Sequence, residues 1–258
     1  MRDAPIAIWV KITKTRGSSP RDAGTAMMVT LNETEGTIGG GALEYSAIAT
    51  ARQILRDNGE ERSETIPLGP SLGQCCGGAV TLLYSFEKRR TDMHYFNTFE
   101  IKNDQPHPKF LWVWGAGHVG RAVVNACPPQ AFKITWVDSA ADRFPVNIPK
   151  HVQKSPAADM PLLASHAPTY AHHLIFTYSH DIDLALCAAL LRHGAASIGV
   201  IGSHTKWARF SKRLRDMGLD PSRIACPIGD KSLGKTPHEI AHGTVQTLLS
   251  ATKTKVPA

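Results

Sequence analysis

A glycine-rich turn constrains the fold of this chain more than any other feature. Gly115, Gly117 and Gly120 form a G-x-G-x-x-G pattern directly after the apolar run Phe110–Trp114 and at the start of a helical pattern. In a strand–turn–helix unit the first glycine makes the turn, the second lets backbone approach a pyrophosphate, and the third lets the helix meet the strand. Asp138 ends the next apolar run, where an acid can accept a ribose hydroxyl. The spacing therefore predicts a turn that binds a dinucleotide or another phosphate-bearing ligand.

Strand-like and helix-like segments alternate through the second half of the chain. Apolar runs at 110–114, 134–137, 173–177 and 197–201 predict buried strands, and helical patterns occupy 118–127, 182–193, 204–217 and 237–250. The last helix begins at Thr236 with a capping box that ends on Glu239. This alternation predicts an α/β fold in which residues 109–258 form a Rossmann-like, doubly wound parallel sheet.

Several polar side chains fall just past the expected carboxyl ends of these strands. His118 lies inside the glycine-rich turn, His180 and Asp183 follow the third strand, and Ser203 with His204 follows the fourth. Doubly wound folds bind ligands at this edge of the sheet. We therefore expect His118, His180 and Ser203 to line a cleft, although His118 could instead donate to a local carbonyl.

The first half of the chain has the pattern of a smaller α+β domain, which we place at residues 1–88. Strands are expected at 6–13 and 25–31 and from Ala79 to Phe86, with a helix over 43–57. Residues 89–108 turn polar and charged, a composition typical of a linker.

Three glycine-bearing segments lie at the ends of these expected elements. They are Gly17–Arg21, Gly39–Gly41 and Gln74–Gly78, and exposed backbone N–H groups are expected in each. Each alone reads as an ordinary tight turn, but three within one small domain suggest a shared ligand site. The residues that we expect to contribute are Ser18, Ser19, Arg21, Gly40, Gly41, Gln74 and Gly77. Glu44, at the start of the helix, suits the positive end of the helix dipole.

The adjacent thiols Cys75 and Cys76 are the candidate metal ligands. Thiolates favour soft metals, and the flanking glycines allow close approach of a ligand. The alternative is that both are small buried hydrophobes. Adjacent residues seldom aim at one metal, so we expect one thiol to contact the metal and the other to support it.

Charge and cysteine usage exclude several classes of protein. The net charge of +7 lies mostly after residue 90, partly on a helix carrying Lys206, Arg209, Lys212, Arg213 and Arg215. We interpret these as a solvated basic face, because no zinc-finger spacing or aromatic–basic repeat accompanies them. An anionic small ligand or an acidic protein partner remains compatible. No run reaches the length of a membrane span, and the five cysteines form no disulfide framework, so we expect a cytoplasmic protein.

The motifs as a set resemble those of the XdhC/CoxI family. The resemblance rests on Arg16–Arg21, Gly39–Glu44, Gln74–Gly78 and Gly115–Arg121, and on Phe144-Pro145, Ile201–Ser203 and Cys226–Gly229. It implies an N-terminal XdhC/CoxI-type domain and a C-terminal Rossmann domain. It further implies a chaperone for molybdenum cofactor (molybdopterin) that works with a cysteine desulfurase, protects the cofactor, and inserts it into xanthine dehydrogenase or a related molybdenum hydroxylase of purine catabolism. A homodimer without turnover chemistry is expected.

The chain departs from the family pattern only in the second domain. Ala140 stands where an arginine is often found, Tyr178 replaces a histidine, and His204 replaces an arginine. Two other functions remain open on the residues alone. The glycine-rich turn and Asp138 suit an NAD(P)-dependent oxidoreductase, although no hydride-transfer constellation accompanies them, and the paired thiols suit a redox or metal sensor.

Overall fold

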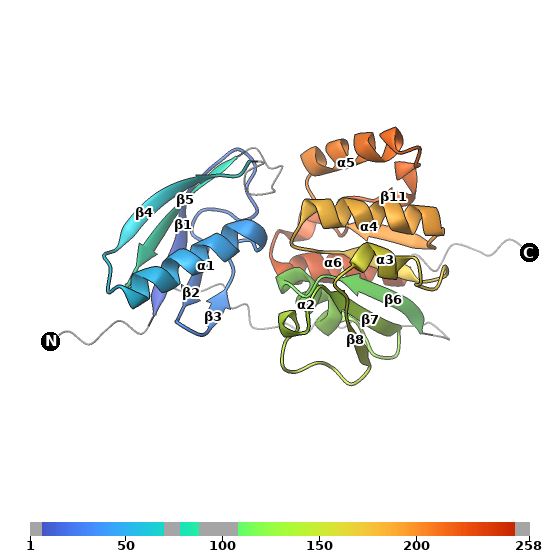
Figure 1. The fold of residues 1–258 in the computed structure, drawn as a ribbon, viewed down its shortest axis with the longest axis horizontal. Coiled ribbons are helices and arrows are strands. Elements are labelled where there is room, and N and C mark those ends of the chain that lie inside the picture. Colours follow the sequence, from blue (N-terminus) through green and yellow to red (C-terminus); the bar gives the residue numbers. More distant parts are fainter. Residues whose placement is uncertain (1–6, 70–77, 88–107, 251–258) are drawn as a thin grey trace, which may run out of the picture. The chain divides into compact units, whose positions relative to one another are not determined.

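The chain folds into two compact units, residues 1–97 and 98–258 (Figure 1). The structure is a computed structural model that describes residues 7–69, 78–87 and 108–250. Each unit is described by itself below. The linker predicted at 89–108 lies almost wholly outside the described residues and stays a prediction.

The first unit is an antiparallel sheet with one helix. Its strands follow the order β3-β2-β1-β5-β4, and every neighbouring pair is antiparallel. The elements are β1 (Ile8–Arg16), β2 (Ala26–Val29), β3 (Thr34–Gly36), α1 (Gly41–Arg56), β4 (Arg62–Pro67) and β5 (Ala79–Ser85). The predicted strands and helix are all present, with ends shifted by a few residues.

Side-chain alternation in the two central strands builds the core of this unit. Ile8, Val10 and Ile12 of β1 are fully buried, whereas the side chains between them are not. Val80 and Leu82 of β5 alternate in the same way. These residues pack against the apolar stripe of α1, formed by Leu43, Ala47, Ala51, Ile54 and Leu55. The helix therefore covers one face of the sheet.

The edge strand β4 has no counterpart in the sequence prediction. Its sequence Arg-Ser-Glu-Thr-Ile-Pro is mostly exposed, and it pairs only with β5. An edge strand with charged side chains resists pairing with other chains. The same polarity removes the apolar signal on which strand prediction depends.

The second unit is a six-stranded parallel sheet with helices on both faces. The strand order β11-β10-β9-β6-β7-β8 is the Rossmann order, so the predicted doubly wound sheet is confirmed. The strands are β6 (Lys109–Trp114), β7 (Phe132–Asp138), β8 (Val152–Pro156), β9 (His172–Ile175), β10 (Ser197–Val200) and β11 (Ile224–Ala225). The helices are α2 (His118–Ala126), α3 (Met160–Ala164), α4 (His180–His193), α5 (His204–Asp216) and α6 (Pro237–Ser250).

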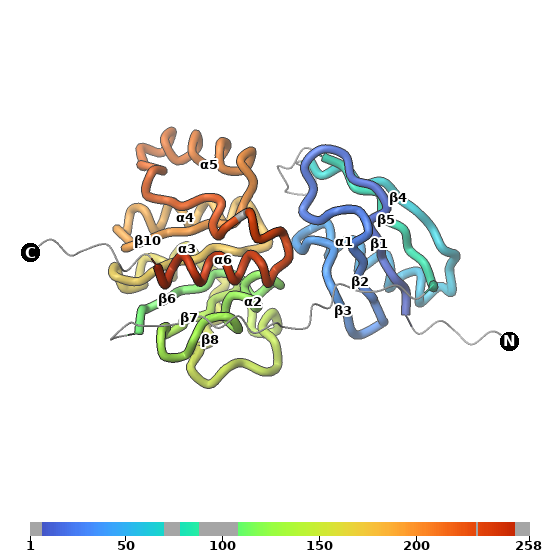
Figure 2. The backbone as a smooth tube through the Cα atoms, turned by 180° about the vertical axis from the view of Figure 1, so that it is seen from behind, coloured from blue at the N-terminus to red at the C-terminus, as the bar shows by residue number. Residues whose placement is uncertain are grey.

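Two apolar clusters show which helices cover which face. One cluster joins Val123 of α2 and Val245 of α6 to the sheet, and the other joins Leu190 of α4 and Phe210 of α5 to its opposite face. Figure 1 shows α3 and α4 in front of the sheet, and α6 comes to the front in the reverse view of Figure 2. The chain thus winds in both directions from β6.

Local sequence explains where the helices begin. The backbone N–H of Thr236 donates to Glu239 Oε2 (2.8 Å), and that of Glu239 donates to Thr236 Oγ1 (3.2 Å), which confirms the predicted capping box. Ser179 and Ser203 cap α4 and α5 through their hydroxyl oxygens.

The sequence prediction missed β8, α3 and β11, which are short or polar. In the part of the chain that the structure describes, no helix has the length and apolar character of a membrane span.

Candidate functional site

In the second unit the glycine-rich turn lies where the sheet reverses its winding. Gly115 has φ +113°, and a Cβ there would overlap the carbonyl oxygen of Phe176, so the ends of β6 and β9 touch at this point. A Cβ on Gly120 would overlap the carbonyl oxygen of Gly115, which holds α2 close to the strand. Gly117 has no atom within 4 Å of such a position. The turn therefore has the conformation that the spacing predicted, with open space beside its second glycine.

Asp138 is used mainly to hold this turn in place. Its side chain is buried, and Oδ2 accepts from the N–H of Ala116 at 2.6 Å. Oδ1 accepts from the N–H of Ser139 at 2.6 Å and lies 3.6 Å from Nε of Arg143. A ribose hydroxyl would have to share these oxygens, whose remaining lone pairs allow it. The ribose role of Asp138 stays a prediction.

Two arginines lie near this acid: Arg121, which was named only as part of the family motif, and Arg143, and neither was predicted as a site residue. Arg121 donates from Nε to the carbonyl of Ala116 (2.7 Å) and from Nη2 to the carbonyl of Arg143 (2.9 Å). Burial lowers the pKa of Arg121, and the negative charge of Asp138 opposes that shift. The guanidinium of Arg143 stacks over the ring of Tyr178 at 4.1 Å. These cations make the turn favourable for an anion.

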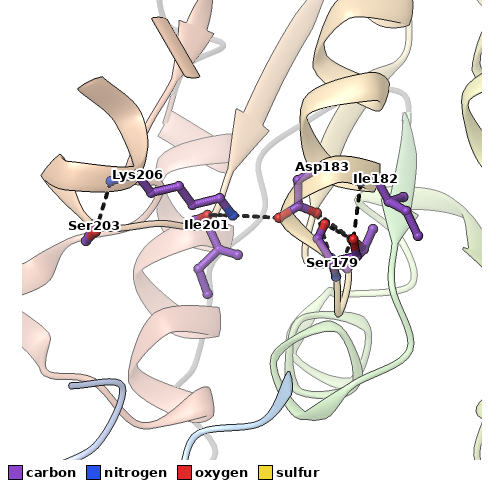
Figure 3. A network of polar contacts seen from close by, with 7 residues as sticks. Ser179, Ile182, Asp183, Ile201, Ser203 and Lys206 are labelled. Carbon is purple, nitrogen blue, oxygen red and sulfur yellow. Dashed lines mark hydrogen bonds and ion pairs between the residues drawn. The ribbon is translucent and has the colours of Figure 1, made fainter. Parts of the chain in front are cut away.

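A buried ion pair ties together the ends of β9 and β10 (Figure 3). Lys206 Nζ lies 2.6 Å from Asp183 Oδ2 and also donates to the carbonyl of Ile201 at 2.8 Å. Asp183 Oδ1 accepts from the hydroxyl of Thr177 at 2.6 Å. The predicted placement of Asp183 past a strand end is correct, but its carboxylate is satisfied inside the protein.

The interpretation of Lys206 as part of a solvated basic face was wrong. Its side chain is 5% exposed, because it lies in the first turn of α5 and points back to the sheet, where Asp183 offers a carboxylate. Arg209, Lys212, Arg213 and Arg215 are exposed, as expected.

The predicted cleft residues are distributed over three helix starts. His180 begins α4, and its ring meets Phe210 of α5 edge to face at 6.3 Å. Burial and then the charge of Lys206 lower the pKa of His180, while Asp183 and Asp181 oppose the shift. Ser203 Oγ accepts from the N–H of Lys206 at 3.2 Å, and His118 begins α2 half-buried. His180, Asp183 and Lys206 therefore form one group at the ends of β9 and β10.

In the first unit, parts of the three predicted glycine segments come together. A Cβ on Gly78 would overlap the carbonyl oxygen of Ser18 and lie 2.5 Å from that of Arg16. A Cβ on Gly39, which has φ +126°, would lie 2.6 Å from the ring of Pro20. The segment after β1 thus contacts both the glycine triplet and the residue that follows Gly77. Gln74, Cys75, Cys76 and Gly77 themselves lie outside the described residues.

The glycine triplet differs from the expectation of exposed N–H donors. Glu44 is buried, and its Oε2 accepts from the N–H groups of Ile38 (2.9 Å) and Gly40 (3.2 Å) and from the hydroxyl of Thr37 (2.5 Å). The N–H of Gly39 donates to Thr37 Oγ1 at 3.1 Å. Glu44 is therefore more than a favourable charge at the helix start, because it organises the turn before α1.

The other predicted residues of this unit are partly committed to internal contacts. The hydroxyl of Ser19 donates to the carbonyl of Arg21 at 2.9 Å, and the Arg21 side chain is buried beside Gly39. Ser18 and Gly41 are exposed. Within residues 7–69, 78–87 and 108–250 no group of three His, Cys, Asp or Glu side chains could hold a metal. Burial raises the pKa of the Cys127 and Cys187 thiols, which suits core packing.

Fold and site together define a two-unit protein. An antiparallel α+β unit, in which glycine-bearing loops contact one another, is followed by a Rossmann unit whose glycine-rich turn has the conformation of a phosphate-binding turn. The model of the XdhC and CoxI family matches residues 5–66, and that of the XdhC Rossmann domain matches residues 111–245, about half of the chain. The chain belongs to the XdhC/CoxI family, as its motifs predicted.

Individual relatives are distant. The uncharacterized protein YqeB of Escherichia coli K12 is 24% identical over 259 residues, and the alignment covers 96% of this chain. The chain spans only 44% of the length of that relative. A crystal structure described as a xanthine dehydrogenase from Bacillus halodurans superposes with a TM-score of 0.51 at 17% identity, over 100% of this chain and 94% of the other. That similarity shows a shared fold.

Proposed function

We propose that this protein is an accessory factor that matures xanthine dehydrogenase or a related molybdenum hydroxylase. In this role it binds molybdenum cofactor, supports its sulfuration with a cysteine desulfurase, protects it, and inserts it into the client enzyme. The single observation that carries the proposal is the family match, which extends over both units. It favours maturation over the oxidoreductase and thiol-sensor alternatives.

The first unit offers the chemistry that such a cargo needs. Molybdenum cofactor is a pterin that carries a phosphate and a dithiolene-bound molybdenum, so a carrier needs donors for the phosphate and a soft ligand for the metal. Ser18 and Gly41, the first residue of α1, are exposed. They lie beside the contacts that Gly78 and Gly39 make with the segment after β1. Gly78, which packs on Ser18, follows directly after the Gln74–Gly77 motif in sequence. The proposed metal contact is a thiolate of Cys75 or Cys76.

Glu44 limits where a cargo phosphate can bind, because its carboxylate already accepts hydrogen bonds from the N–H groups of Ile38 and Gly40. A cargo phosphate would therefore bind beside this turn and not inside it. The carboxylate keeps the turn in one conformation before cargo arrives, so less conformational entropy is lost on binding.

The test is to co-express the chain with cofactor biosynthesis and to measure molybdenum and pterin in the purified protein. Wild type should carry both and should reconstitute an apo-hydroxylase. Cys75→Ser or Cys76→Ser should lower the molybdenum content, whereas Cys226→Ser, in the second unit, should not. A wild-type protein without pterin that cannot reconstitute the enzyme would refute the proposed function. Full loading of both motif variants would refute only the role given to the thiols.

A further inference from the structure

A stacked pair of side chains spans the end of the central strand of the second unit. Arg143 follows β7, Tyr178 follows β9, and β6 lies between these two strands in the sheet. The guanidinium carbon of Arg143 lies 4.1 Å from the centroid of the Tyr178 ring. The two side chains therefore meet across the carboxyl end of β6, where the glycine-rich turn begins.

The pair is both accessible and anchored. The Arg143 side chain is 44% exposed and Tyr178 is 46% exposed, so both are accessible to solvent. Behind them, Arg143 Nε lies 3.6 Å from Asp138 Oδ1, and the Arg143 carbonyl accepts from Arg121 Nη2. An exposed aromatic ring beside a fixed guanidinium is a combination that stacks on nucleobases.

Open space beside Gly117 suits a diphosphate. Gly117 lies in the turn after β6, and no atom lies within 4 Å of the position that a Cβ would take there. The turn is held by Asp138 and Arg121 through the N–H and the carbonyl of Ala116. A ligand can therefore approach the backbone closely at Gly117, in the turn after β6. Arg143 and Tyr178 follow β7 and β9, the strands on either side of β6.

We propose that Arg143 and Tyr178 form the base-binding subsite of a nucleotide site in the second unit. The ligand class is a nucleoside diphosphate, either free or as half of a dinucleotide. The base of this ligand stacks on the Tyr178 ring, with the Arg143 guanidinium at the edge of the base or on the opposite face of the ring. The diphosphate of the ligand lies along Gly117. The site is independent of the proposed cargo site, and either can fail without the other.

The unit also contains a matched surface pair for control. Tyr170 is 62% exposed, and its ring meets Phe110 at 5.1 Å. Lys133 Nζ lies 5.4 Å from the centroid of the Phe110 ring. Tyr170 and Phe110 lie near the amino ends of β9 and β6, the opposite edge of the sheet from Tyr178. Tyr170→Ala therefore removes an exposed ring without touching the proposed subsite.

The experiment is calorimetric titration of the full chain with ADP, with NADH and with inorganic pyrophosphate. We expect both nucleotides to bind more tightly than pyrophosphate. Tyr178→Ala should weaken ADP about tenfold, the size of effect typical for loss of one stacked base. Tyr178→Phe and Tyr170→Ala should bind ADP as wild type does, and Arg143→Gln should weaken it. Equal affinity for ADP and NADH would show that a free nucleoside diphosphate is enough to fill the site. Tighter binding of NADH would show that the ligand is a dinucleotide.

Two results would overturn the proposal. One is the absence of heat and of any melting shift with either nucleotide at about 1 mM, the weakest affinity expected of such a site. The other is wild-type ADP affinity in both Tyr178→Ala and Arg143→Gln. Circular dichroism and melting curves of each variant show that the fold is retained, and Tyr178→Phe provides a folded comparison if the alanine variant unfolds.

Discussion

The ammonium of Lys206 lies 2.6 Å from the carboxylate of Asp183, and neither side chain is more than 5% exposed. The two residues come from α5 and α4, so their contact fixes the loops after β10 and β9 against each other (Figure 3). Lys206 also donates to the Ile201 carbonyl, and Asp183 also accepts from the hydroxyl and the backbone N–H of Thr177. A buried pair of this kind makes the carboxyl edge of the sheet rigid at the cost of sensitivity to the loss of either partner.

Lys206→Met should lower the free energy of unfolding by about 3–5 kcal/mol, because it leaves the carboxylate of Asp183 buried without its cation. Adding Asp183→Asn should restore part of that loss, which a double-mutant cycle in urea measures. The exposed pair of Arg213 and Asp181, 3.6 Å apart, is the control, and Arg213→Met should cost less than about 1 kcal/mol. Equal effects at the two pairs would contradict the importance of burial.

Gly78→Ala should destabilise the first unit by about 1–3 kcal/mol, because its Cβ would overlap backbone oxygens of Ser18 and Arg16 that cannot rotate away. Gly69→Ala is the matched control, since no atom lies within 4 Å of its Cβ position. Thermal melting monitored by circular dichroism distinguishes the two. A Gly78→Ala protein as stable as Gly69→Ala would show that the two segments do not pack as described.

Glu44→Ala should cost about 2–4 kcal/mol, because it leaves the buried N–H of Ile38 and the hydroxyl of Thr37 without their shared acceptor. Glu44→Gln should cost less, since its amide oxygen can still accept. Hydrogen exchange of the Ile38 and Gly40 amides is the direct measurement. Unchanged protection of these amides in Glu44→Ala would argue against the role of the carboxylate.

Stability should fall below pH 6.5 because of His173. Burial, with smaller effects from His172 and His193, lowers the pKa of His173 from 6.5 to about 3. Between these values the unfolded chain binds a proton that the folded chain does not, so each unit of acidification removes up to about 1.4 kcal/mol. His173→Gln should flatten the slope of unfolding free energy against pH.

The control for this pH dependence is His166→Gln, which alters an exposed histidine and should keep the wild-type slope. Some slope should remain in His173→Gln, because burial also lowers the pKa of His172 and His180. An identical slope in wild type and His173→Gln would exclude His173 as its source.

The sequence predicted the architecture better than the contacts within it. Glycine spacing and apolar runs located the turn at Gly115 and the alternation around it, because backbone geometry at such turns depends on local residues. The same reasoning missed the edge strands β4 and β8, because their mostly polar residues show no apolar periodicity. It also misplaced Lys206, since the orientation of one residue in the first turn of a helix depends on a partner 23 positions away.

The stack of Arg143 on Tyr178 had no sequence signal at all. Arg143 belongs to a three-residue helical turn after β7, too short to show periodicity, and Tyr178 follows a different strand. Only the strand order brings them together. Contacts of this kind, made between loops at one sheet edge, require the tertiary fold.

The separation of the apolar clusters has a consequence for how such a protein can change over time. Among the described residues, the cluster beneath α1 draws only on the first unit, and the two clusters around the parallel sheet draw only on the second. Neither interior would be opened if the gene were divided between them. Among the described residues each unit therefore packs its own interior, so a change to the core side chains of one unit leaves those of the other unaltered.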